Sequence, residues 1–383
     1  MKILAVGGGS GGHVTPVVAV LREIKKAHPR AEIRFWCDRK FSTQSRAIMG
    51  HFDPSIKVST VVGGKFRRYN HVSFLRQLLW FSVVILNIRD LFLVVFGFIQ
   101  SIFKLVIWRP DVVFTKGGYV CLPVGIAARL MGIPLVIHDS DAHPGLTNRI
   151  LGKWANAIAT GAPLEYYSYP ADRSRYTGIP VSDEFRQFSR AQQLAAKKKW
   201  EIDVNRPLVV VTGGGLGASR INDTVVLTLH NLLKHSSIIL ISGTWQYDEI
   251  RALTPANDDK FQLHSFISRD MASLLGAADV VVTRAGATTI LELAALAKPT
   301  ILIPNGKLTG GHQLKNAAVY LKDDAVVVLD ENEMMKKPEM LEHAIKDLLS
   351  DKVRSEKMAK KFSSFSRPNA ASDVADMIIS NAK

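Results

Sequence analysis

The sequence has little cysteine, and this limits the classes of protein to which it can belong. Cys37 and Cys121 are the only two among 383 residues, too few for a disulfide framework or for the ligand spacing of a zinc site. The start of the chain also lacks the apolar run and cleavage site of an export signal, because residues 1–6 have the pattern of a buried strand. We therefore expect a protein of a reducing compartment.

The sequence also lacks an uncharged apolar run long enough to span a membrane. The segment from Leu78 to Trp108 is strongly apolar, but Asn87, Arg89 and Asp90 interrupt it, and no remaining uncharged run reaches the ~20 residues that a spanning helix needs. Two interpretations stay open: a buried helix pair, or a surface that enters the membrane interface. Nearby basic residues favour contact with anionic lipid headgroups; they are Lys65, Arg67, Arg68, Arg76, Lys104 and Arg109.

Acidic residues are outnumbered: 34 Asp and Glu stand against 49 Lys and Arg, a formal net charge of +15. Such a field attracts phosphates, anionic lipid surfaces or nucleic acids. The basic run at residues 197–199, beside Trp200, is accompanied by no recognised nucleic-acid motif. We interpret that run as a solvated helix face and expect no nucleic-acid partner.

Apolar, β-branched runs alternate with helical patterns, which predicts α/β domains with doubly wound parallel sheets. The first half has strand patterns at residues 2–6, 32–37, 112–115 and 135–138, with helical patterns at 16–26 and 123–131. The pattern restarts with strands at residues 207–211, 237–242, 280–283 and 300–304.

This duplication predicts two Rossmann-like domains, residues 1–178 and 179–366, with a last helix within residues 367–383 that packs back on the first domain. We expect the two domains to face a cleft at the carboxyl ends of their strands, where open α/β sheets bind ligands.

A glycine-rich turn, GGGSGGH, follows the first strand at residues 7–13. Glycine lets the backbone turn sharply and lets a phosphate approach bare N–H groups at a helix start. The turn also satisfies the G-x-G-x-x-G dinucleotide pattern, with Asp38 near the position of the ribose-binding acid. A nicotinamide or flavin oxidoreductase is therefore the main alternative to a phosphate-binding transferase, although it gives His13 no role.

Three further stretches place glycine and polar residues after strands of the second half. Residues 212–218 (TGGGLGA) repeat the glycine turn, and one such turn in each domain suits two phosphate-bearing ligands better than one. Residues 283–292 (TRAGATTILE) open a helix whose first amides can hold a diphosphate, while Glu292 can accept bonds from ribose hydroxyls. Residues 304–317 lead into a helix bearing Gln313, where the hydroxyls of a sugar can be bound.

Taken in order, these stretches resemble the MurG family of glycosyltransferases. The strongest similarity is GGGSGGHVTP at residues 7–16, close to the family's GGTGGHVFP. KGGYV at residues 116–120 and HDSDAHPGLTNRIL at 138–151 are similar to the family's GGY and HEQN…GLTN, and RAGATTILELAALAKPTILIP at 284–304 is also close. The resemblance covers most of the chain and implies the GT-B fold, with the sugar donor in the C-terminal domain.

The resemblance implies an inverting hexosyltransferase of peptidoglycan synthesis, peripheral at the cytoplasmic face of the cell membrane. Such an enzyme moves N-acetylglucosamine (GlcNAc) from UDP-GlcNAc to the 4-hydroxyl of the muramyl sugar of undecaprenyl-diphosphoryl-MurNAc-pentapeptide. It needs no metal or other cofactor.

The resemblance also implies the residues of two binding sites. The acceptor side would comprise Gly9, Gly117, Gly118, Tyr119 and Asn148. The donor side would comprise Ser10, Gly11, Gly12, Asp141, Gly215, Ile267, Arg284, Ala287, Thr288, Glu292 and Gln313. The chain departs from the family pattern at two places. Gly215-Leu216 stand where the family has Ser-Gln, and Ser182 stands where the family has an arginine, whose role Arg186 or Arg284 can take. Both departures bear on the identity of the donor sugar.

Glycosyl transfer needs a base for the attacking hydroxyl and positive partners for the leaving diphosphate. His13, at a predicted helix start and able to titrate near pH 7, is our candidate base or acceptor-orienting group, and Asp139 is the alternative. Residues 138–143 also hold a D-x-D pattern between two histidines, as in some metal sites. Adjacent residues after a strand point in opposite directions, so we expect no metal there.

Two other functions fit part of the pattern. A UDP-sugar epimerase can share the fold, but it acts on a soluble sugar and needs no apolar surface between residues 78 and 108. A non-catalytic membrane-associated binding protein explains the charge and the apolar segment but not the paired glycine turns.

Overall fold

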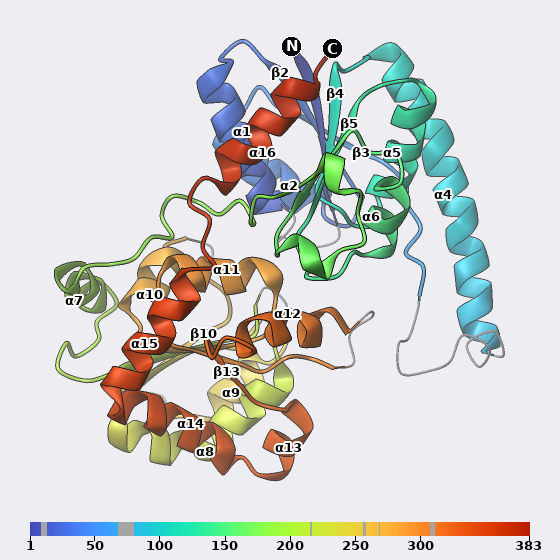
Figure 1. The fold of residues 1–383 in the computed structure, drawn as a ribbon. Helices are drawn as coiled ribbons and strands as arrows, with labels where there is room; N and C mark the ends of the chain where they lie inside the picture. The colour runs from blue at the N-terminus through green and yellow to red at the C-terminus, as the bar shows by residue number, and fades with distance from the viewer. Residues whose placement is uncertain (9–13, 68–79, 215–216, 256–257, 268, 307–310) are drawn as a thin grey trace. The chain divides into compact units, whose positions relative to one another are not determined.

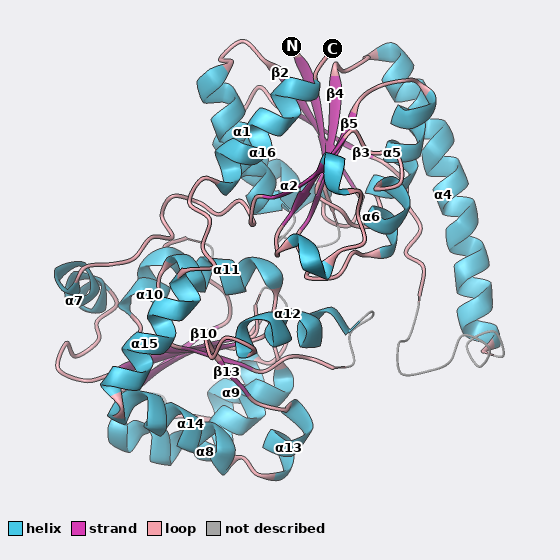
Figure 2. Cartoon of the chain, in the orientation of Figure 1, coloured by secondary structure: helices cyan, strands magenta, loops and turns pink. Residues whose placement is uncertain are grey.

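The computed structural model describes residues 1–8, 14–67, 80–214, 217–255, 258–267, 269–306 and 311–383. The chain forms two compact units. Unit 1 comprises Met1–Ser182, Leu308–His312 and Arg367–Lys383, and unit 2 comprises Asp183–Lys307 and Gln313–Ser366. Each unit is built on one parallel sheet with helices around it, which confirms the predicted α/β fold class (Figures 1 and 2).

The sheet of unit 1 runs in the order β3-β2-β1-β4-β5-β6-β7. Its strands are β1 (Lys2–Val6), β2 (Glu32–Cys37), β3 (Lys57–Thr60), β4 (Val112–Thr115), β5 (Leu135–Asp139), β6 (Ala157–Thr160) and β7 (Ser174–Tyr176). The strand order reverses between β1 and β4, which are paired in parallel. Since open α/β sheets bind ligands at the carboxyl ends of the strands beside this reversal, the loops after β1 and β4 mark the candidate site of unit 1.

Alternate residues of β1 face opposite sides of the sheet, and each side has its own apolar core. Ile3 and Ala5 belong to a core shared with α1 (Val14–Ala27), α2 (Ser42–Phe52) and α16 (Ala370–Asn381). Leu4 and Val6 belong to the opposite core, shared with α4 (Phe81–Ile107), α5 (Cys121–Leu130) and α6 (Leu146–Leu151). Figure 1 shows α1 beside α16 and α4 beside α5. The C-terminal helix α16 is thus part of unit 1, although most of unit 2 precedes it in the sequence.

The sheet of unit 2 repeats the same arrangement in the order β10-β9-β8-β11-β12-β13. Its strands are β8 (Leu208–Thr212), β9 (Ser237–Ile241), β10 (Phe261–His264), β11 (Val280–Thr283), β12 (Thr300–Leu302) and β13 (Val327–Val328). Its helices are α7 (Arg190–Lys199), α8 (Ser219–His235), α9 (Tyr247–Leu253), α10 (Met271–Ala277), α11 (Ala287–Ala295), α12 (His312–Leu321), α13 (Glu331–Lys336), α14 (Glu339–Ser350) and α15 (Lys352–Ser363). The order reverses between β8 and β11, so the loops after these two strands mark the candidate site of unit 2.

The apolar segment after residue 80 forms the single 27-residue helix α4, so the interpretation as a buried helix pair is wrong. One face of α4 packs on unit 1 so closely that a Cβ on Gly97 would lie 1.9 Å from the Val62 carbonyl oxygen. The opposite face is exposed: Phe92 has 69% and Ile107 has 82% of its surface accessible. By length and composition α4 is apolar enough to cross a membrane, and only 22% of its most apolar stretch is buried.

Candidate active site

The two loops at the strand reversal of unit 1 touch through glycine. Gly118, which follows β4, has φ +90°, and a Cβ there would lie 2.7 Å from the carbonyl oxygen of Gly8, which follows β1. Gly117 also has a positive φ of +87°, a conformation that favours glycine. The sequence therefore needs glycine after β4 so that this loop can turn against the first glycine-rich turn.

Asp38, the candidate ribose-binding acid of the dinucleotide interpretation, is engaged within the protein. Its side chain is 4% exposed, and its Oδ1 accepts a hydrogen bond of 3.2 Å from the Phe41 backbone N–H. Burial, the nearby Asp38 charge and a hydrogen bond to that carboxylate raise the pKa of the Tyr119 hydroxyl. A carboxylate buried between these groups is poorly placed to bind ribose hydroxyls, which argues against the oxidoreductase.

Asp139 ends β5 and is buried, with 3% of its surface exposed. Its Oδ2 accepts a hydrogen bond of 2.7 Å from the Tyr169 hydroxyl. Burial raises the pKa of the Asp139 carboxyl to about 7, against the lowering effect of the Tyr169 hydrogen bond. A carboxyl group that titrates near neutral pH can accept a proton in a general-base step.

Asn148, on α6, lies beside Asp139 and the glycine loop after β4. Its Nδ2 donates to the His138 carbonyl oxygen at 3.3 Å, and a Cβ on Gly117 would lie 3.2 Å from that nitrogen. Its Oδ1 is buried without a hydrogen-bond partner in the described part of the chain. Asp141 is half-buried in the loop after β5, and its carbonyl accepts from the Tyr167 hydroxyl at 2.7 Å. The structure thus brings Gly117, Asn148 and Asp139 to one place.

Replacing Asp139 by asparagine should remove a pH dependence of stability. Because the folded-state pKa is raised from 3.8 to about 7, the contribution of Asp139 to stability is full below pH ~4 and is lost as the pH rises through 7. Urea unfolding should therefore show that Asp139→Asn gains roughly 2 kcal/mol relative to the wild type between pH 5.5 and 8.

Asp53→Asn serves as the matched control. Hydrogen bonds from Ser55 lower the pKa of Asp53, so its contribution is lost only as the pH falls below 3.8, and this variant should parallel the wild type between pH 5.5 and 8. If Asp139→Asn also ran parallel to the wild type, Asp139 would not be a group that titrates near neutral pH.

Some predicted site residues lie outside the described part of the chain: Gly9, Ser10, Gly11, Gly12, His13 and Gly215. Among the residues that the structure describes, no three His, Cys, Asp or Glu side chains gather to hold a metal ion. His138 is buried with its Nε2 2.9 Å from the Gly178 carbonyl oxygen, and Asp139 is bonded to Tyr169 instead.

In unit 2, the loop after β8 depends on glycine as the loops of unit 1 do. Gly217 has φ +74°, and a Cβ there would lie 2.4 Å from the Ser242 carbonyl oxygen, which follows β9. Gly214 has φ +77°, and its N–H is bonded to the Thr212 hydroxyl at 3.2 Å. This close packing keeps the turn at the carboxyl end of β8, beside the end of β11.

Helix α11 starts at this edge, and its first turn and Glu292 form the second part of the unit 2 site. Gly286 is the N-cap, with Ala287 and Thr288 half-buried at the first helical positions, so the helix N-terminus and its partial positive charge lie after β11. Glu292 is half-buried, and its carboxylate has no hydrogen-bond partner among the described residues, although its backbone carbonyl accepts from the Leu296 N–H. Burial raises the pKa of its carboxyl to about 7.

Gln313 and Arg284 differ in how many of their side-chain hydrogen bonds are made within the protein. The Gln313 Oε1 accepts from the Asn305 backbone N–H at 2.8 Å, so the loop after β12 and the start of α12 are held together. The Arg284 guanidinium is buried, donates to the Ile303 carbonyl oxygen at 3.0 Å and pairs with Glu331. Arg284 therefore fixes the loops after β11 and β12. Ile267, half-buried after β10, lies on the same edge of the sheet.

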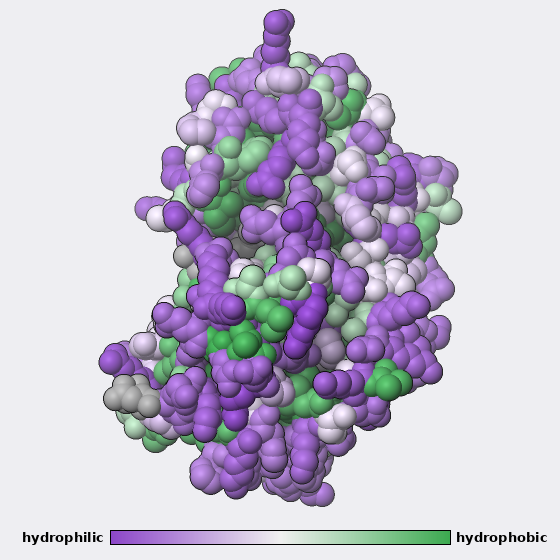
Figure 3. Space-filling view, turned by 90° about the vertical axis from the view of Figure 1, so that its left-hand side faces the viewer, coloured by the Kyte–Doolittle hydropathy of each residue, from purple (hydrophilic) through white to green (hydrophobic). Residues whose placement is uncertain are grey.

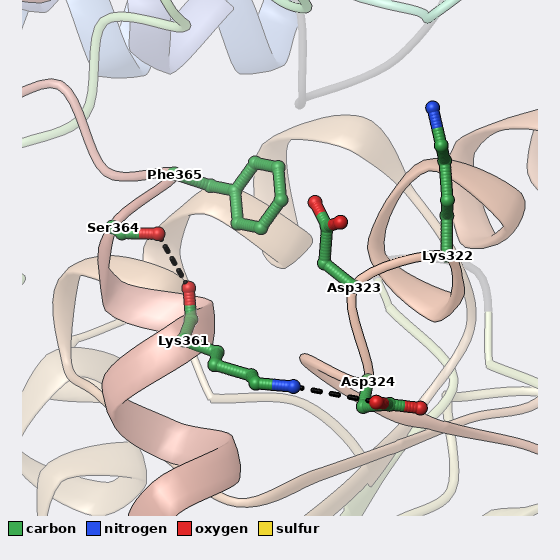
Figure 4. A pocket seen from close by; sticks show the side chains of 6 residues that line it. All are labelled: Lys322, Asp323, Asp324, Lys361, Ser364 and Phe365. Carbon is green, nitrogen blue, oxygen red and sulfur yellow. Dashed lines mark hydrogen bonds and ion pairs between the residues drawn. The ribbon is translucent and has the colours of Figure 1, made fainter.

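A pocket of about 430 Å³ in unit 2 is not part of this site (Figure 4). It is lined by Lys322, Asp323, Asp324, Lys361, Ser364 and Phe365. Lys361 pairs with Asp324 at 3.3 Å, and most of these side chains are exposed. The loop containing Asp323 precedes β13 and so lies at the amino edge of the parallel sheet, opposite the edge where ligands bind.

Sequence reasoning missed the partners of several site residues. Tyr169 lies 30 positions from Asp139, and no motif marks it. Glu331 is 47 positions from Arg284 and sits at the start of α13, where a solvated acid is the ordinary expectation. Lys116 could have been identified by its place directly before Gly117-Gly118. The structure leaves only 2% of it exposed, which is unusual for a lysine.

The family model of the glycosyltransferase family 28 N-terminal domain matches residues 3–160, and that of the C-terminal domain matches residues 208–374. A UDP-N-acetylglucosamine–N-acetylmuramyl-(pentapeptide) pyrophosphoryl-undecaprenol N-acetylglucosamine transferase of Clostridium kluyveri is 34% identical over 94% of this chain and 92% of its own.

Two solved structures share the fold. Acinetobacter baumannii MurG has a TM-score of 0.73 at 23% identity, with 99% of each chain covered. A Neisseria meningitidis UDP-GlcNAc 2-epimerase bound to UDP-GlcNAc has a TM-score of 0.66 at 15% identity, covering 99% of this chain and 100% of that one. With both domain models matched and a relative above 30% identity over nearly the full length, this chain belongs to glycosyltransferase family 28 and, within it, to the MurG family.

Proposed function

We propose that the protein transfers GlcNAc from UDP-GlcNAc to the 4-hydroxyl of the muramyl sugar of undecaprenyl-diphosphoryl-MurNAc-pentapeptide. Membership of the MurG family supports this assignment. The observation that carries it is the duplication of a glycine-dependent turn at the strand reversal of each sheet, after β1 and β4 in unit 1 and after β8 in unit 2. Two such turns supply backbone N–H groups to two diphosphates, one of the lipid acceptor and one of the sugar donor.

Unit 1 binds the acceptor in this proposal. The predicted acceptor contacts are Gly9, Gly117, Gly118, Tyr119 and Asn148, and the Gly117-Gly118 loop follows β4 at the strand reversal, where open α/β sheets bind ligands. The buried, unpartnered Oδ1 of Asn148 is an acceptor suited to a sugar or peptide donor group.

Unit 2 binds the donor. The N-terminus of α11 at Ala287 and Thr288 holds the diphosphate, and the Glu292 carboxylate accepts bonds from the ribose hydroxyls. Gln313 donates hydrogen bonds to the sugar hydroxyls through its Nε2, because its Oε1 already accepts from the Asn305 backbone N–H. Arg284 acts by fixing the two loops around the donor. The remaining predicted donor contacts are Ser10, Gly11, Gly12, Asp141, Gly215 and Ile267.

The reaction is a single inverting displacement. The acceptor 4-oxygen forms a bond to the anomeric carbon, the bond between that carbon and the diphosphate oxygen breaks, and UDP leaves with the electron pair. The proton of the attacking hydroxyl passes to His13 or, in the alternative, to Asp139, whose pKa of about 7 suits the step. Full turnover in a His13→Ala variant would leave Asp139 as the candidate base.

Helix α4 attaches unit 1 to the cytoplasmic face of the membrane, as a peripheral contact. One face of α4 packs on α5 and on the segment after β3, so the helix lies along unit 1, and its exposed apolar face is free to enter the interface. By contrast, the left-hand side of Figure 1, shown in space-filling form in Figure 3, is mostly hydrophilic with scattered apolar groups.

Charge supports this contact less than the sequence predicts. Arg67 pairs with the buried Asp90 at 2.6 Å, and Lys104 donates to the Thr60 carbonyl oxygen at 2.7 Å. Arg109 donates to the Met131 carbonyl oxygen at 3.0 Å, while Arg68 and Arg76 lie outside the described residues.

Incubation with radiolabelled UDP-GlcNAc and a lipid-linked muramyl-peptide acceptor tests the proposal. We expect label in the lipid product, and only when the acceptor is present. Release of free N-acetylmannosamine would instead indicate the epimerase, whose fold is similar. Binding of the lipid with neither product would indicate a binding protein.

A further inference from the structure

A chain of hydrogen-bonded polar groups, buried except for the half-buried Ser140, runs through unit 1 from the loop after β4 to residue 178. Lys116, which is 2% exposed, is hydrogen-bonded through Nζ to the Ser140 hydroxyl. The Ser140 Oγ lies 3.4 Å from Nδ1 of His138, and Nε2 of His138 lies 2.9 Å from the Gly178 carbonyl oxygen. His138 is completely buried, so its ring nitrogens depend on their protein partners, whereas Ser140 is half-buried.

The partners determine the direction of every bond. A carbonyl oxygen only accepts, so the His138 Nε2 carries the proton that is donated to Gly178. Burial and the neighbouring Lys116 charge hold the pKa of His138 well below its ordinary value, so the ring is neutral and Nδ1 accepts. The Ser140 hydroxyl therefore donates to Nδ1 and accepts from the Lys116 ammonium, which has no lone pair to offer.

The far end of this chain of bonds lies where the polypeptide passes between the two units. The segment Met1–Ser182 ends shortly after Gly178, and Arg367–Lys383, another of the three segments of unit 1, begins beside Gly178 in space. Gly178 has φ +79°, and a Cβ there would lie 2.6 Å from the Arg367 Cβ. The Gly178 carbonyl also accepts from the Thr177 hydroxyl at 3.0 Å, so its two lone pairs are occupied.

We propose that Lys116, Ser140 and His138 are positioning residues that couple the Gly117-Gly118 loop to the connection between the units at Gly178. The three side chains are bonded in series, so breaking any one of these bonds interrupts this side-chain path while the backbone pairing of β4, β5 and β6 remains. A change that acceptor binding makes in the loop then reaches residue 178 through these three side chains. The kinetic part of this inference rests on the proposed function, whereas the exchange measurement below does not.

Hydrogen–deuterium exchange tests the coupling without any substrate. The Thr177 and Gly178 amides are bonded to the Thr160 carbonyl oxygen at 3.2 and 3.0 Å, so their exchange reports on the connection. We expect Lys116→Met and Ser140→Ala each to speed this exchange about tenfold, and Ser140→Thr, which keeps the hydroxyl, to restore it.

Lys298→Met is the matched control, because Lys298 is also buried and donates to the Gly276 and Ala278 carbonyl oxygens of unit 2. It should leave exchange at residues 177 and 178 unchanged. Unaltered exchange in both Lys116→Met and Ser140→Ala, or equal acceleration by Lys298→Met, would overturn the inference.

Steady-state kinetics then separate positioning from simple destabilisation. Each single variant should lower kcat/KM for the acceptor about tenfold without changing the affinity for UDP-GlcNAc, and Lys116→Met with Ser140→Ala together should cost no more than either alone. Multiplicative losses would show that the two residues act independently and would contradict the coupling. If the wild type shows no transfer, the proposed function fails, and the exchange data still decide the coupling.

Discussion

Glu292→Gln is expected to weaken the binding of UDP-GlcNAc about 100-fold. The Glu292 carboxylate is half-buried without a hydrogen-bond partner among the described residues, so it is available to two ribose hydroxyls. Bonds to a charged group contribute about 1.5–3 kcal/mol each, and an amide oxygen replaces them only in part. Calorimetry with UDP-GlcNAc and with its 2′,3′-dideoxyribose analogue measures the effect: the wild type should discriminate strongly between the two ligands, and the variant should not.

The pH dependence of the same binding gives a second readout. Burial raises the pKa of Glu292 to about 7, so the ionised fraction rises between pH 6 and 8, and wild-type affinity for UDP-GlcNAc should rise with it. The diphosphate of UDP-GlcNAc does not titrate in this range, and the Glu292→Gln variant has no carboxyl group at this position, so its affinity should be nearly flat. Exposed Glu339→Gln is the control and should behave as the wild type does. Equal discrimination by Glu292→Gln and the wild type would remove Glu292 from the ribose site.

The fold could be predicted from the sequence because buried parallel strands are short, continuous apolar runs. β1, β2, β4 and β11 occupy the predicted residues, since each run is bounded by a polar or glycine-rich segment that cannot continue the strand. The sites follow from the same logic, because in a parallel sheet every segment after a strand lies at one edge.

The state of each site side chain could not be predicted, because it depends on partners that are distant in the sequence. Asp139 titrates near pH 7 because of its burial, and Tyr169 supplies its hydrogen bond. Arg284 is of a residue type that commonly binds phosphate, yet its guanidinium is bonded to Glu331 and to the Ile303 carbonyl oxygen. Neither interaction leaves a local pattern in the sequence.

Asp90 explains why the sequence did not predict α4 as one continuous helix. A charged residue within an apolar run suggests an interruption, but Asp90 is 1% exposed and lies on the face that packs against unit 1. Arg67 and Arg89 pair with it at 2.6 and 2.9 Å. Because the carboxylate is paired on the inner face, the outer face of α4 is mostly apolar, with the exposed Arg89 as a charged exception.

Replacing Phe92, Phe96 and Phe103 by serine should reduce the partitioning of the protein onto phospholipid vesicles about 100-fold. These rings are 69%, 59% and 67% exposed on the outer face of α4. Full burial of a phenylalanine contributes about 1.5–3 kcal/mol, and partial insertion at the interface gives about 1 kcal/mol for each ring. Vesicle sedimentation measures the change, with Leu227, Leu253 and Val353 of unit 2 replaced by serine as a control, since they are 70%, 65% and 79% exposed.

Salt separates the apolar contribution to this binding from the electrostatic one. Since Arg67 and Lys104 are engaged within unit 1, raising the salt concentration to about 0.5 M should weaken the wild-type protein only a few-fold, and binding to neutral vesicles should persist. Complete release by salt, or unchanged binding of the serine variant, would place the membrane contact on basic residues instead of on α4. Under the expected result, the exposed apolar face of α4 contributes most of the binding of the protein to lipid.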